Sequence, residues 1–533
     1  MSERLFMGVD SSTQSMKVIL IDESLNEVAE QMVNFDADLP QFKTRGGVHH
    51  GEDGLTVTSP PQLWVAALDL VLDRLKDAGA PLDRVVAISG SGQQHGSVYW
   101  KKGAREGLRD LRAGSSLHDQ TQSLFSVSAS PIWMDSSTGD QCQALEAALG
   151  GPQTVADITG SRAYERFTGN QIAKVAQTQS AAYADTERIS LVSSLVATLF
   201  IGDYAAIDVS DGSGMNMMDI RSRDWSEAAL EATAPDLADR MGEVVASHAC
   251  VGTVHSYFVE SYGFSPDCQV IACSGDNPCS LAGLRLQQSG DIAISMGTSD
   301  TIFGALSDPQ PSADEGHIFC SPVNPEGFMA LVCYKNGSLT RESVRDAVAD
   351  GDWDTFSTLL SESEPGNGGR IGFYLKEPEI TPPILTTGTF RFDEEGQAVE
   401  AFDAAGDVRA VVEGQFLSMR LHCRNIGIQP TQILATGGAS HNAAILQVMA
   451  DVFGAPVYTA ESPNSAPLGA AYRALHGWAC KEQGDFVPFA EVLKVAPPFQ
   501  KAADPNSDAH QTYSTMLSDY ERLEQVVIDT VSS

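Results

Sequence analysis

A strand-turn-strand pattern occurs twice in the chain, once near the N-terminus and once past its middle. Residues Arg4–Asp10 are apolar and end in a turn rich in hydroxyl side chains, after which Met16–Asp22 predict a second strand. The same design returns at Asp291–Met296, followed by a Gly-Thr-Ser turn and Ile302–Leu306. Two such units in the two halves of one chain predict an internally duplicated α/β fold, although short hairpins of this kind also arise by chance.

The length and charge of the chain limit what it can be. With 533 residues it is too long for one compact core, so two large domains are expected. The later half alternates helices with strands, which favours a layered α/β architecture. Its 70 acidic against 34 basic residues give a net charge of -36, a field that repels nucleic acid and anionic membranes. A phosphate-bearing substrate would therefore need local donors, backbone amides or a metal ion.

Targeting and cysteine patterns point to an ordinary cytoplasmic protein. No uninterrupted apolar segment approaches the length needed to cross a bilayer, and the residues before Leu5 lack the apolar core of a signal peptide. The nine cysteines are scattered and form no Cys-x-x-Cys pair. Neither a structural zinc site nor a disulfide framework is expected.

The stretch Val270–Pro278 predicts a strand that delivers one carboxylate. Its short apolar run is typical of a buried strand, Ser274–Gly275 allow a tight bend, and Asp276 precedes a helix. One interpretation is that Asp276 only caps this helix. The functional interpretation is favoured by a second turn, Gly297–Thr301, about twenty residues later, because two such turns suggest one cleft.

Several turns carry polar side chains suited to ligands. The turn after Asp10 can wrap phosphate oxygens with hydroxyls and amides, and the acid can hold magnesium through water. It is not a Walker loop, and no Gly-x-Gly-x-x-Gly opens a dinucleotide-binding unit. Gly437–Gly438 before a helix allow a purine or a diphosphate to lie against bare backbone, or merely a close contact between helix and strand.

Other residues suit sugar hydroxyls, each with a structural alternative. Gln93, Gln94 and His95 offer donors and acceptors in one turn, or His95 is simply satisfied within it. Trp133 near Asp135 is typical of a carbohydrate site, where a ring covers sugar carbons, but also of a core Trp beside a helix cap.

Three further stretches carry expectations of their own. The loop Arg162–Gln171 has two arginines, for substrate oxygens or a surface salt bridge. The adjacent His49 and His50 could ligate a metal, although such pairs more often decorate a surface loop. Glu187–Phe200 predict an apolar helix, and Asp208–Asn216 a polar turn between elements.

The set of turns, in this order and over essentially the whole chain, resembles the FGGY carbohydrate kinases of the actin and hexokinase superfamily. The resemblance is carried by Leu55–Pro60, Gly92–Ser97, Arg162–Gln171 and Ser274–Pro278. It implies two actin-like (ribonuclease H-like) α/β domains around a central cleft. Residues 1–268 would bind mainly sugar and residues 269–533 mainly ATP.

The resemblance also implies a reaction and a site. ATP would phosphorylate D-xylulose at its C5 hydroxyl, giving D-xylulose 5-phosphate and ADP by in-line transfer with Asp276 as the general base. Sugar would be held at positions His95, Arg166, Asp276 and Asn277, and magnesium near Asp10. ATP would be held at positions Thr13, Gly297, Thr298, Ser299, Trp353, Gly437, Gly438 and Asn442. The expected partners are a small sugar and ATP, with the chain a monomer or a homodimer.

Departures from the family pattern keep alternatives open. Bacterial members acting on the same sugar usually carry Gln-Met-His-Gly where this chain has Gln93–Gly96, so the floor of the sugar site is more polar here. Ser137 stands where glycerol-specific members pair an arginine with the Trp-x-Asp motif, which weakens a glycerol assignment. The alternatives are a kinase for ribulose, glycerol or gluconate, or a non-catalytic nucleotide-binding scaffold of actin type.

Overall fold

The computed structural model describes residues 4–460 and 464–532. The chain divides into two compact units, each built from separate stretches of sequence. The first consists of Met1–Gln287, Ile318–Gly327 and Asn464–Ala496, and the second of Gln288–His317, Phe328–Pro463 and Pro497–Ser533. The expected assignment of residues 1–268 to sugar and 269–533 to ATP stays a prediction.

A mixed sheet forms the centre of the first unit, in the strand order β14-β15-β6-β1-β2-β3. Strand β1 pairs antiparallel with β2 and parallel with β6, and β6 pairs parallel with β15 and with the short β16. The strands are β1 (Leu5–Ser11), β2 (Ser15–Asp22), β3 (Glu27–Asn34), β6 (Val85–Gly92), β14 (Cys250–Thr253), β15 (Gln269–Ile271) and β16 (Ser274–Gly275).

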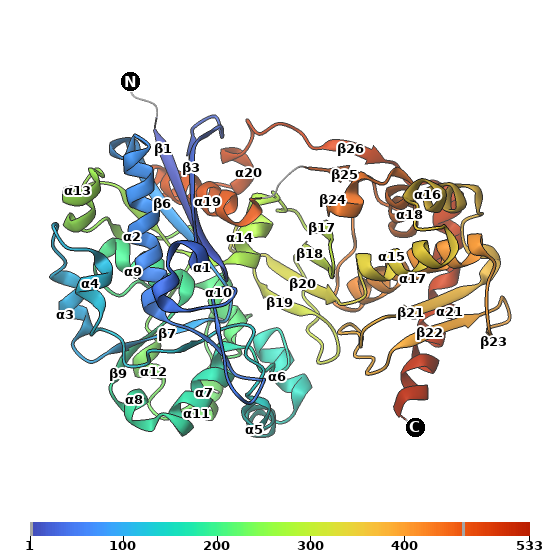
Figure 1. Ribbon diagram of the computed structural model, residues 1–533, viewed down its shortest axis with the longest axis horizontal. Helices are drawn as coiled ribbons and strands as arrows, with labels where there is room; N and C mark the ends of the chain where they lie inside the picture. The colour runs from blue at the N-terminus through green and yellow to red at the C-terminus, as the bar shows by residue number, and fades with distance from the viewer. Residues whose placement is uncertain (1–3, 461–463, 533) are drawn as a thin grey trace. The chain divides into compact units, whose positions relative to one another are not determined.

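Helices cover both faces of this sheet (Figure 1). On one face Leu5, Met7 and Val9 share a core with α2 (Pro61–Asp77) and α9 (Val192–Ile201). On the other face Phe6 packs on Trp478 of α19 (Ser465–Gln483), with 5.6 Å between the ring centroids. Because both faces are buried, β1 is apolar along nearly its whole length rather than alternating.

Smaller elements complete the first unit. They are α1 (Phe35–Asp38), β4 (His49–His50), β5 (Val57–Ser59), β7 (Ser97–Lys101), α3 (Ala104–Arg109), α4 (Leu117–Thr121), β8 (Ser130–Pro131), α5 (Gly139–Leu149), α6 (Pro152–Thr159), α7 (Thr168–Thr178), α8 (Ser180–Ala184), β9 (Thr186–Leu191), β10 (Ile207–Asp208), α10 (Val209–Gly212), β11 (Met218–Asp219), β12 (Asp224–Trp225), α11 (Glu227–Thr233), α12 (Ala238–Met241), β13 (Val244–Val245), α13 (Ser256–Tyr262), α14 (Asp276–Gly283) and α20 (Phe489–Val492).

The second unit repeats the same sheet. Six strands of its seven-stranded sheet follow the order β20-β18-β17-β24-β25-β26, with β17 antiparallel to β18 and parallel to β24, and β24 parallel to β25. The seventh, β19 (His317–Cys320), lies beyond β20. The six strands match β3-β2-β1-β6-β15-β14 in both order and direction, so the predicted duplication is confirmed. The strands are β17 (Asp291–Met296), β18 (Asp300–Leu306), β20 (Phe328–Tyr334), β24 (Gln432–Gly437), β25 (Val457–Thr459) and β26 (Gln500–Ala503).

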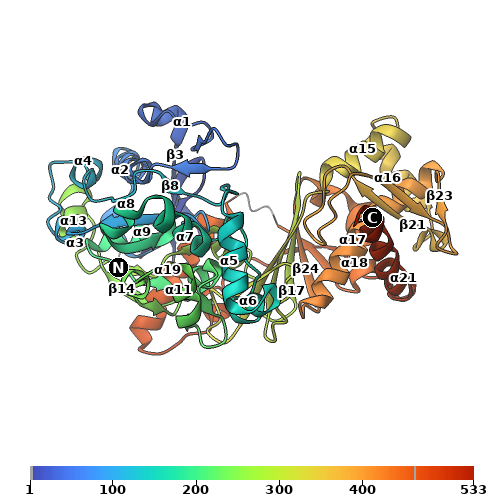
Figure 2. The same ribbon diagram turned by 90° about the horizontal axis from the view of Figure 1, so that it is seen from below.

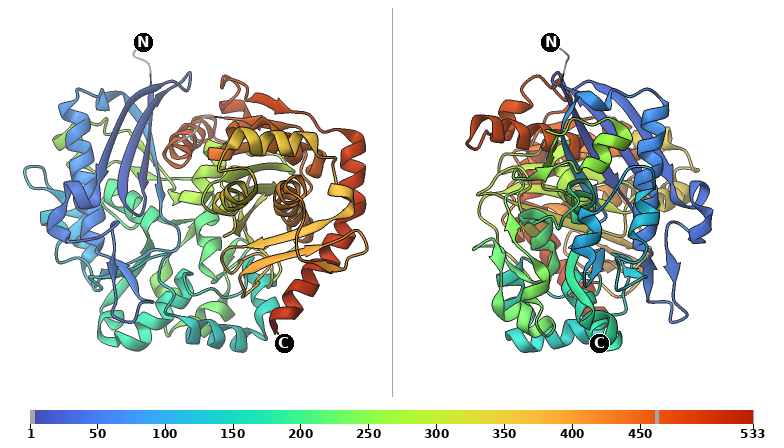
Figure 3. Two further views of the ribbon diagram at one scale, coloured as in Figure 1. Left: turned by 45° about the vertical axis from the view of Figure 1, so that its right-hand side comes forward. Right: turned by 90° about the vertical axis from the view of Figure 1, so that its left-hand side faces the viewer.

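The helices of the second unit pack around α17 (Ala404–Asn425), which contacts four other helices. Figure 2 shows α17, α18 and α21 side by side, and Figure 3 shows the red α21 running along the edge of this unit. The remaining elements are α15 (Ser338–Val348), α16 (Trp353–Glu362), α18 (Ala443–Phe453) and α21 (Ser507–Ser532), with a small sheet of β21 (Ile371–Leu375), β22 (Gly388–Phe392) and β23 (Ala398–Val399).

Two sequence-based expectations about local structure can now be judged. The helix predicted over Glu187–Phe200 is wrong in its first part, because Thr186–Leu191 form β9 and the helix begins only at Val192. Pairing with β7 and the bond from Trp100 Nε1 to Ser190 Oγ (2.9 Å) override the local helical preference.

All nine cysteines are free thiols, as expected. Within residues 4–460 and 464–532, no helix has the length and apolar character to span a membrane.

His422 on α17 links three parts of the second unit through a buried charge cluster. Its Nδ1 lies 2.7 Å from Glu315 and its Nε2 lies 3.3 Å from Glu524 of α21. Burial opposes a charge on this imidazole, but the hydrogen bonds to Glu315 and Glu524 outweigh it and raise the pKa of His422 to about 9. The folded protein therefore holds the imidazolium well above the pH at which the unfolded chain loses it, about 6.5.

We predict a pH-dependent contribution of His422 to stability. Because the folded pKa is raised, the contribution is complete below pH 6.5 and is lost as the pH rises through 9. His422→Gln should lower the free energy of unfolding at pH 6.5, and its deficit relative to the native chain should shrink by on the order of 2 kcal/mol by pH 9. Thermal unfolding of both proteins across this range measures the difference, and a deficit independent of pH would contradict the prediction.

Candidate active site

Asp276 stands at the carboxyl edge of the first unit's sheet. It is the first residue of α14, directly after β16, which runs parallel to the end of β6. The interpretation of Asp276 as the helix cap is wrong, because Gly275 occupies the cap position and no side chain bonds there. Instead, Asp276 Oδ1 accepts from the backbone amides of Asn277 (2.9 Å) and Gln94 (3.3 Å). Burial raises the pKa of Asp276 to about 6, although these amides oppose the rise.

Asp10 is the penultimate residue of β1, opposite Ser91 of β6. Its Oδ1 is buried and has no hydrogen-bond partner within the described part of the chain. Burial raises the pKa of Asp10 to about 7, and the nearby charge of Asp276 adds to the rise. The nearby Ser91 hydroxyl opposes this rise, and the ammonium of Lys17 opposes it to a smaller extent. Lys17 is itself bonded to Asn464 (2.7 Å) and paired with Glu30 (3.2 Å).

A third carboxyl group, that of Asp211 on the short helix α10, lies close to Gly275, the residue before Asp276. A Cβ added to Gly275 would come within 2.7 Å of Asp211 Oδ1 and 2.3 Å of Gln94 Cγ, so the backbone must pass close to both. Burial raises the pKa of Asp211 to about 8, with Asp208 and Asp276 adding to the rise, and Ser193 Oγ donates to its Oδ2. Asp211 is therefore a protonated acid at neutral pH.

Asp211 had only a weak signal in the sequence. The stretch Asp208–Asn216 predicted a polar turn, and the Asp-x-x-Asp spacing within it was the one available pointer. The first acid of that pair has a different role. Asp208 is buried, accepts from the hydroxyls of Ser247 and Ser274, and has Arg473 Nη2 at 3.6 Å from its Oδ1. Its charge is thus balanced inside the protein.

His95 presents a neutral imidazole in the same region. Its Nδ1 lies 3.0 Å from the carbonyl oxygen of Gly214, and its ring stacks on Phe167 at 4.3 Å between centroids. A carbonyl can only accept, so Nδ1 carries the hydrogen and Nε2 is left as an acceptor. Burial lowers the pKa of His95 to about 3, and the charge of Arg166 adds to this. An uncharged acceptor of this kind suits a hydroxyl group.

The remaining predicted sugar-contacting residues lie on the same elements. Asn277 Nδ2 donates to Gln94 Oε1 at 2.6 Å, which fixes the orientation of both amides. The Arg166 guanidinium lies 5.9 Å from the Phe167 ring, the same ring on which His95 stacks. The structure therefore brings His95, Arg166 and the pair Asp276–Asn277 together within the first unit.

Several polar atoms at this edge of the sheet are buried without a partner. In the described residues, an unpaired buried atom occurs on the side chains of Asp10, Ser11, Ser91, Gln93 and Gln94. Buried polar groups in folded proteins are normally hydrogen-bonded, so each such atom calls for an explanation. A polar ligand with several hydroxyl groups would supply the missing partners.

Thr13, predicted at the phosphate loop, lies in the turn between β1 and β2. Trp133 Nε1 donates to Thr13 Oγ1 at 2.8 Å, and the Trp133 side chain is 43% exposed. Asp135 is buried and accepts from the amide of Val57 (2.9 Å) and from Gln171 Nε2 (2.8 Å). These bonds occupy its carboxylate within the protein. The alternative of a core Trp beside a helix cap is wrong, because Trp133 is exposed and the cap position of the next helix, α5, is Thr138.

The second unit has a cavity of about 710 Å³ whose lining includes Trp353, Gly438 and Asn442. Gly437, just before it, has a φ of +82°, and a Cβ there would lie 2.4 Å from the carbonyl oxygen of Met296, so only glycine fits. Asn442 caps α18 and donates to Ser357 Oγ at 2.8 Å. The cavity volume is in the range typical of ligand sites.

The predicted second phosphate turn adjoins this cavity. Gly297, Thr298 and Ser299 connect β17 to β18, and the amide of Ser338, which lines the cavity, donates to the carbonyl oxygen of Gly297 at 2.8 Å. All the nucleotide positions predicted in the second half of the chain therefore lie around one cavity or next to it.

The possible metal site at His49 and His50 has no support. His49 Nε2 lies 2.9 Å from the carbonyl oxygen of Phe42, a bond within the loop. In residues 4–460 and 464–532, no three His, Cys, Asp or Glu side chains are grouped so that they could hold a metal ion on their own.

Comparison with known proteins identifies the class. Residues 5–283 match the N-terminal domain, and residues 292–478 the C-terminal domain, of the FGGY family of carbohydrate kinases. The chain therefore belongs to this family, as the resemblance of its turns predicted. It is 53% identical to the xylulose kinase of Mus musculus over 530 residues, which cover 99% of this chain and 95% of that protein.

Solved structures support the same fold. The xylulose kinase of Rhodospirillum rubrum matches with a TM-score of 0.79 and 17% identity, covering 99% of this chain and 100% of that one. The gluconate kinase of Lactobacillus acidophilus matches with a TM-score of 0.77 and 17% identity, covering 100% and 99%. The predicted actin-like, ribonuclease H-like α/β fold with two domains is thus confirmed, but likeness at this identity shows the fold alone.

We predict that Asp211 can be replaced by asparagine but not by alanine. An amide resembles a protonated acid in shape and hydrogen bonding, whereas alanine leaves the Ser193 hydroxyl without its acceptor, a loss of about 1–3 kcal/mol. Because burial raises the pKa of Asp211 to about 8, the unfolded chain ionises first and native stability falls as the pH rises toward 8.

The Asn variant does not titrate, so its unfolding temperature relative to the native chain should increase from pH 5.5 to pH 8. Thermal unfolding of the native, Asn and Ala forms at both pH values checks this. A large loss of stability in Asp211→Asn at pH 7 would show that the native group is a carboxylate.

Proposed function

We propose that this chain transfers the γ-phosphoryl group of ATP to the C5 hydroxyl of D-xylulose, giving D-xylulose 5-phosphate and ADP. One observation carries the proposal. A partly buried carboxylate, Asp276, accepts from the amide of Gln94, the residue before the neutral acceptor His95, in a chain that is 53% identical to a xylulose kinase over nearly its full length. Family membership supports the reaction class, and this identity supports the choice of sugar.

Asp276 is the proposed general base. With its pKa raised to about 6, it is mostly ionised at pH 7 and still basic enough to accept a proton from a sugar hydroxyl in the transition state. A base in this position contributes roughly 10²- to 10⁴-fold to the rate, so alignment and charge neutralisation must supply the rest. The bonds from Gln94 and Asn277 hold its Oδ1, which leaves Oδ2 for the substrate.

The other sugar contacts follow from hydrogen-bonding capacity. His95 Nε2 would accept from one hydroxyl, and Asn277 and Arg166 would donate to sugar oxygens. Gln94 and Asn277 hold each other, so the floor of the proposed site is set before sugar binds. The side-chain amide of Gln93 has no hydrogen-bond partner among the described residues, so it offers both a donor and an acceptor to the same ligand.

ATP is assigned mainly to the second half of the chain, residues 269–533, and sugar to residues 1–268. The adenosine part would lie in the cavity bordered by Trp353, Gly438 and Asn442, with Gly437 at its edge. Phosphate oxygens would be bound by Thr13 and by the turn Gly297–Ser299, which includes Thr298, through hydroxyls and backbone amides.

The residues present fit a magnesium ion at Asp10. Its Oδ1 is buried and unpaired in the described structure, and its charge is disfavoured by burial, so a cation would compensate it. Magnesium is typically held by one or two carboxylates together with waters and substrate phosphates, which agrees with the absence of a larger ligand cluster in the described residues. When bound, the ion neutralises charge on the phosphates.

We predict that Asp276→Asn abolishes turnover with little effect on binding. The amide keeps the shape but cannot accept the proton, so kcat should fall at least 10²-fold while the KM values for D-xylulose and ATP change less than threefold. ADP release with magnesium-ATP and D-xylulose measures this, run beside D-ribulose, glycerol, gluconate and no sugar. Asp69→Asn is the matched control, since Asp69 is also a buried acid of the first unit but bonds to the amides of Leu117 and His118.

Each outcome separates the candidates. Turnover that needs D-xylulose and Asp276 supports the proposal. Preference for another polyol would keep the mechanism and discard the sugar. Equal ADP release without sugar, or full activity of Asp276→Asn, would favour a nucleotide-binding scaffold or an ATPase.

We predict that the reaction requires a divalent cation that Asp10 helps to hold. EDTA should abolish ADP release, and added magnesium should restore it. Asp10→Asn should raise the magnesium concentration for half-maximal activity at least tenfold and leave the KM for D-xylulose within threefold, because the amide oxygen is a weaker ligand than a carboxylate. A magnesium titration of both proteins at saturating sugar tests this, and an unchanged magnesium requirement in Asp10→Asn would remove Asp10 from the metal site.

A further inference from the structure

Asp300 and Arg341 form an ion pair that is entirely buried in the second unit. Asp300 begins β18, directly after the turn Gly297–Ser299, and Arg341 lies in the first turn of α15. Arg341 Nη1 lies 2.7 Å from Asp300 Oδ2, and Nη2 lies 3.0 Å from Oδ1. Both side chains have an exposed fraction of 0%. The contact is thus the two-pronged arrangement that is typical of arginine with a carboxylate.

The pair extends into a network that reaches the turn by a second route. Arg341 Nη1 also donates to Gln415 Oε1 of α17 at 2.7 Å, and Gln415 Nε2 donates to the carbonyl oxygen of Asn336 at 2.6 Å. Ser338 follows Asn336 by two residues, and its backbone amide donates to the carbonyl oxygen of Gly297. Asp300, Arg341 and Gln415 therefore connect the turn, the segment Asn336–Ser338 and the long helix α17.

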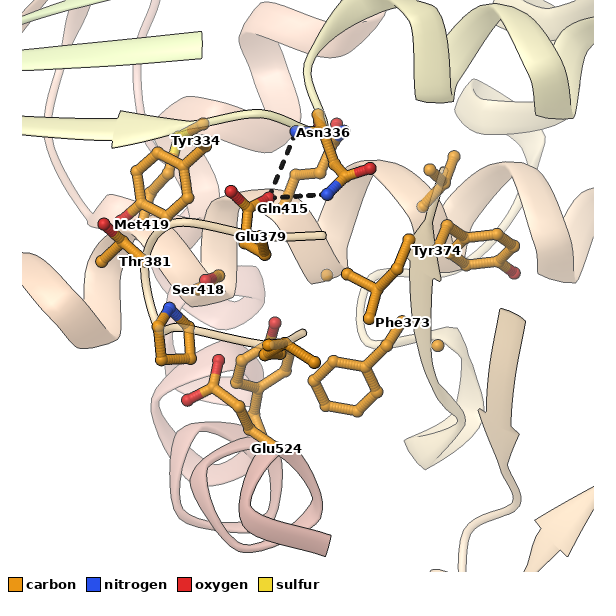
Figure 4. A pocket seen from close by; sticks show the side chains of 17 residues that line it. Tyr334, Asn336, Phe373, Tyr374, Glu379, Thr381, Gln415, Ser418, Met419 and Glu524 are labelled. Carbon is orange, nitrogen blue, oxygen red and sulfur yellow. Dashed lines mark hydrogen bonds between the residues drawn. The ribbon is translucent and has the colours of Figure 1, made fainter. Parts of the chain in front are cut away.

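The segment Asn336–Ser338 is itself held firmly. Figure 4 shows the amide and the side chain of Asn336 directed at the carboxylate of Glu379, with distances of 3.2 Å and 2.9 Å. The cavity beside this contact, bordered by Tyr334 and Phe373, has a volume of only about 50 Å³, room for a few water molecules at most. No ligand of useful size fits behind the segment, so the space serves packing.

Contact between the segment and the turn is direct. A Cβ added to Gly337 would lie 2.6 Å from Asp300 Oδ1 and 2.8 Å from the carbonyl oxygens of both Gly297 and Thr298. Any movement of Arg341 or Gln415 would therefore be passed to the backbone of the turn. Both oxygens of Asp300 are used by Arg341, so this acid is not available to hold a metal ion.

Stability alone is a poor reason for such a pair. Removing two charges from water costs as much free energy as their attraction returns, and replacing a buried pair by apolar side chains is often neutral. What the pair does supply is a fixed geometry, because the planar guanidinium accepts one orientation of the carboxylate.

We propose that Asp300, Arg341 and Gln415 are positioning residues that hold the turn Gly297–Ser299 in the conformation that binds the phosphates of ATP. They act through the backbone of the turn. Arg341 also borders the cavity of about 710 Å³, whereas Gln415 is not among the described residues that line it, so Gln415→Met tests the route through the backbone by itself. The inference rests on the proposed function, which assigns phosphate binding to this turn.

The experiment compares ligands with and without phosphates. Binding of adenosine, ADP and magnesium-ATP to the full chain is measured by calorimetry for the native protein, Arg341→Lys and Gln415→Met. Lysine keeps the charge but loses the two-pronged contact, and methionine removes the bonds of Gln415 while leaving the ion pair intact. Both variants should bind ADP and magnesium-ATP at least tenfold more weakly and adenosine within twofold of the native protein.

Tyr334→Phe is the matched control. The Tyr334 hydroxyl is buried beside the same segment and has no hydrogen-bond partner in the described residues, so its removal should leave all three affinities within twofold. If Arg341→Lys does not fold, Gln415→Met decides the question. The inference is overturned if phosphate-bearing ligands bind the variants as tightly as they bind the native chain, or if adenosine binding falls by the same factor, which would indicate general damage to the unit.

Failure of the proposed function gives a different result. If the native chain binds ATP more tightly than adenosine but releases no ADP with D-xylulose, the assigned reaction is refuted. The affinities of the same variants for phosphate-bearing ligands then still decide the positioning role. If ADP and magnesium-ATP bind the native chain no more tightly than adenosine does, both the proposed function and the positioning role are refuted.

Discussion

The burial of carboxyl groups at the edge of one sheet is the constraint on which the candidate active site depends. Asp10, Asp211 and Asp276 reach this edge from β1, α10 and α14, and burial raises the pKa of each. Three neighbouring carboxylates cannot all stay ionised in a low dielectric, so their environments must separate their protonation states. The three pKa values differ in this way: that of Asp211 is raised to about 8, which favours the neutral acid, and that of Asp276 to about 6, which leaves it mostly ionised at pH 7. The pKa of Asp10 is raised to about 7, and the proposed cation would compensate its charge.

The two units share a topology, but the carboxylate beside the first turn has different partners in each unit. In the first unit, Asp10 precedes the turn and keeps a buried oxygen without a partner among the described residues. In the second unit, Asp300 follows the turn and both of its oxygens are bound by Arg341. The duplicated fold thus supplies one acid that can receive a cation and one whose charge is cancelled internally. In a chain with a net charge of -36, that cancellation would favour the phosphate binding proposed for this turn.

Much of the fold was predictable because its signals are local. Strand β1 is buried on both faces and reads as a continuous apolar run, and the turn after it resembles the turn after β17, so both hairpins and their duplication could be read from the sequence. The error at Glu187–Phe200 came from a long-range effect, the pairing of β9 with β7. Asp211 was missed for a similar reason, because its significance depends on the close approach of Gly275 and Gln94, which are distant in sequence.

The identity of the sugar depends on side chains rather than on the fold. The same architecture occurs in a gluconate kinase at a TM-score of 0.77, so backbone arrangement does not choose between a pentulose and a sugar acid. Gln94 is the position that departs from the bacterial pattern. Its side-chain oxygen accepts from the Asn277 amide, and its backbone N–H donates to the Asp276 carboxylate. A methionine there could keep only the backbone bond, since its side chain offers the Asn277 amide no comparable acceptor. Gln94 therefore couples the shape of the proposed sugar floor to the proposed base, and a difference in substrate preference within this fold can arise from that one amide.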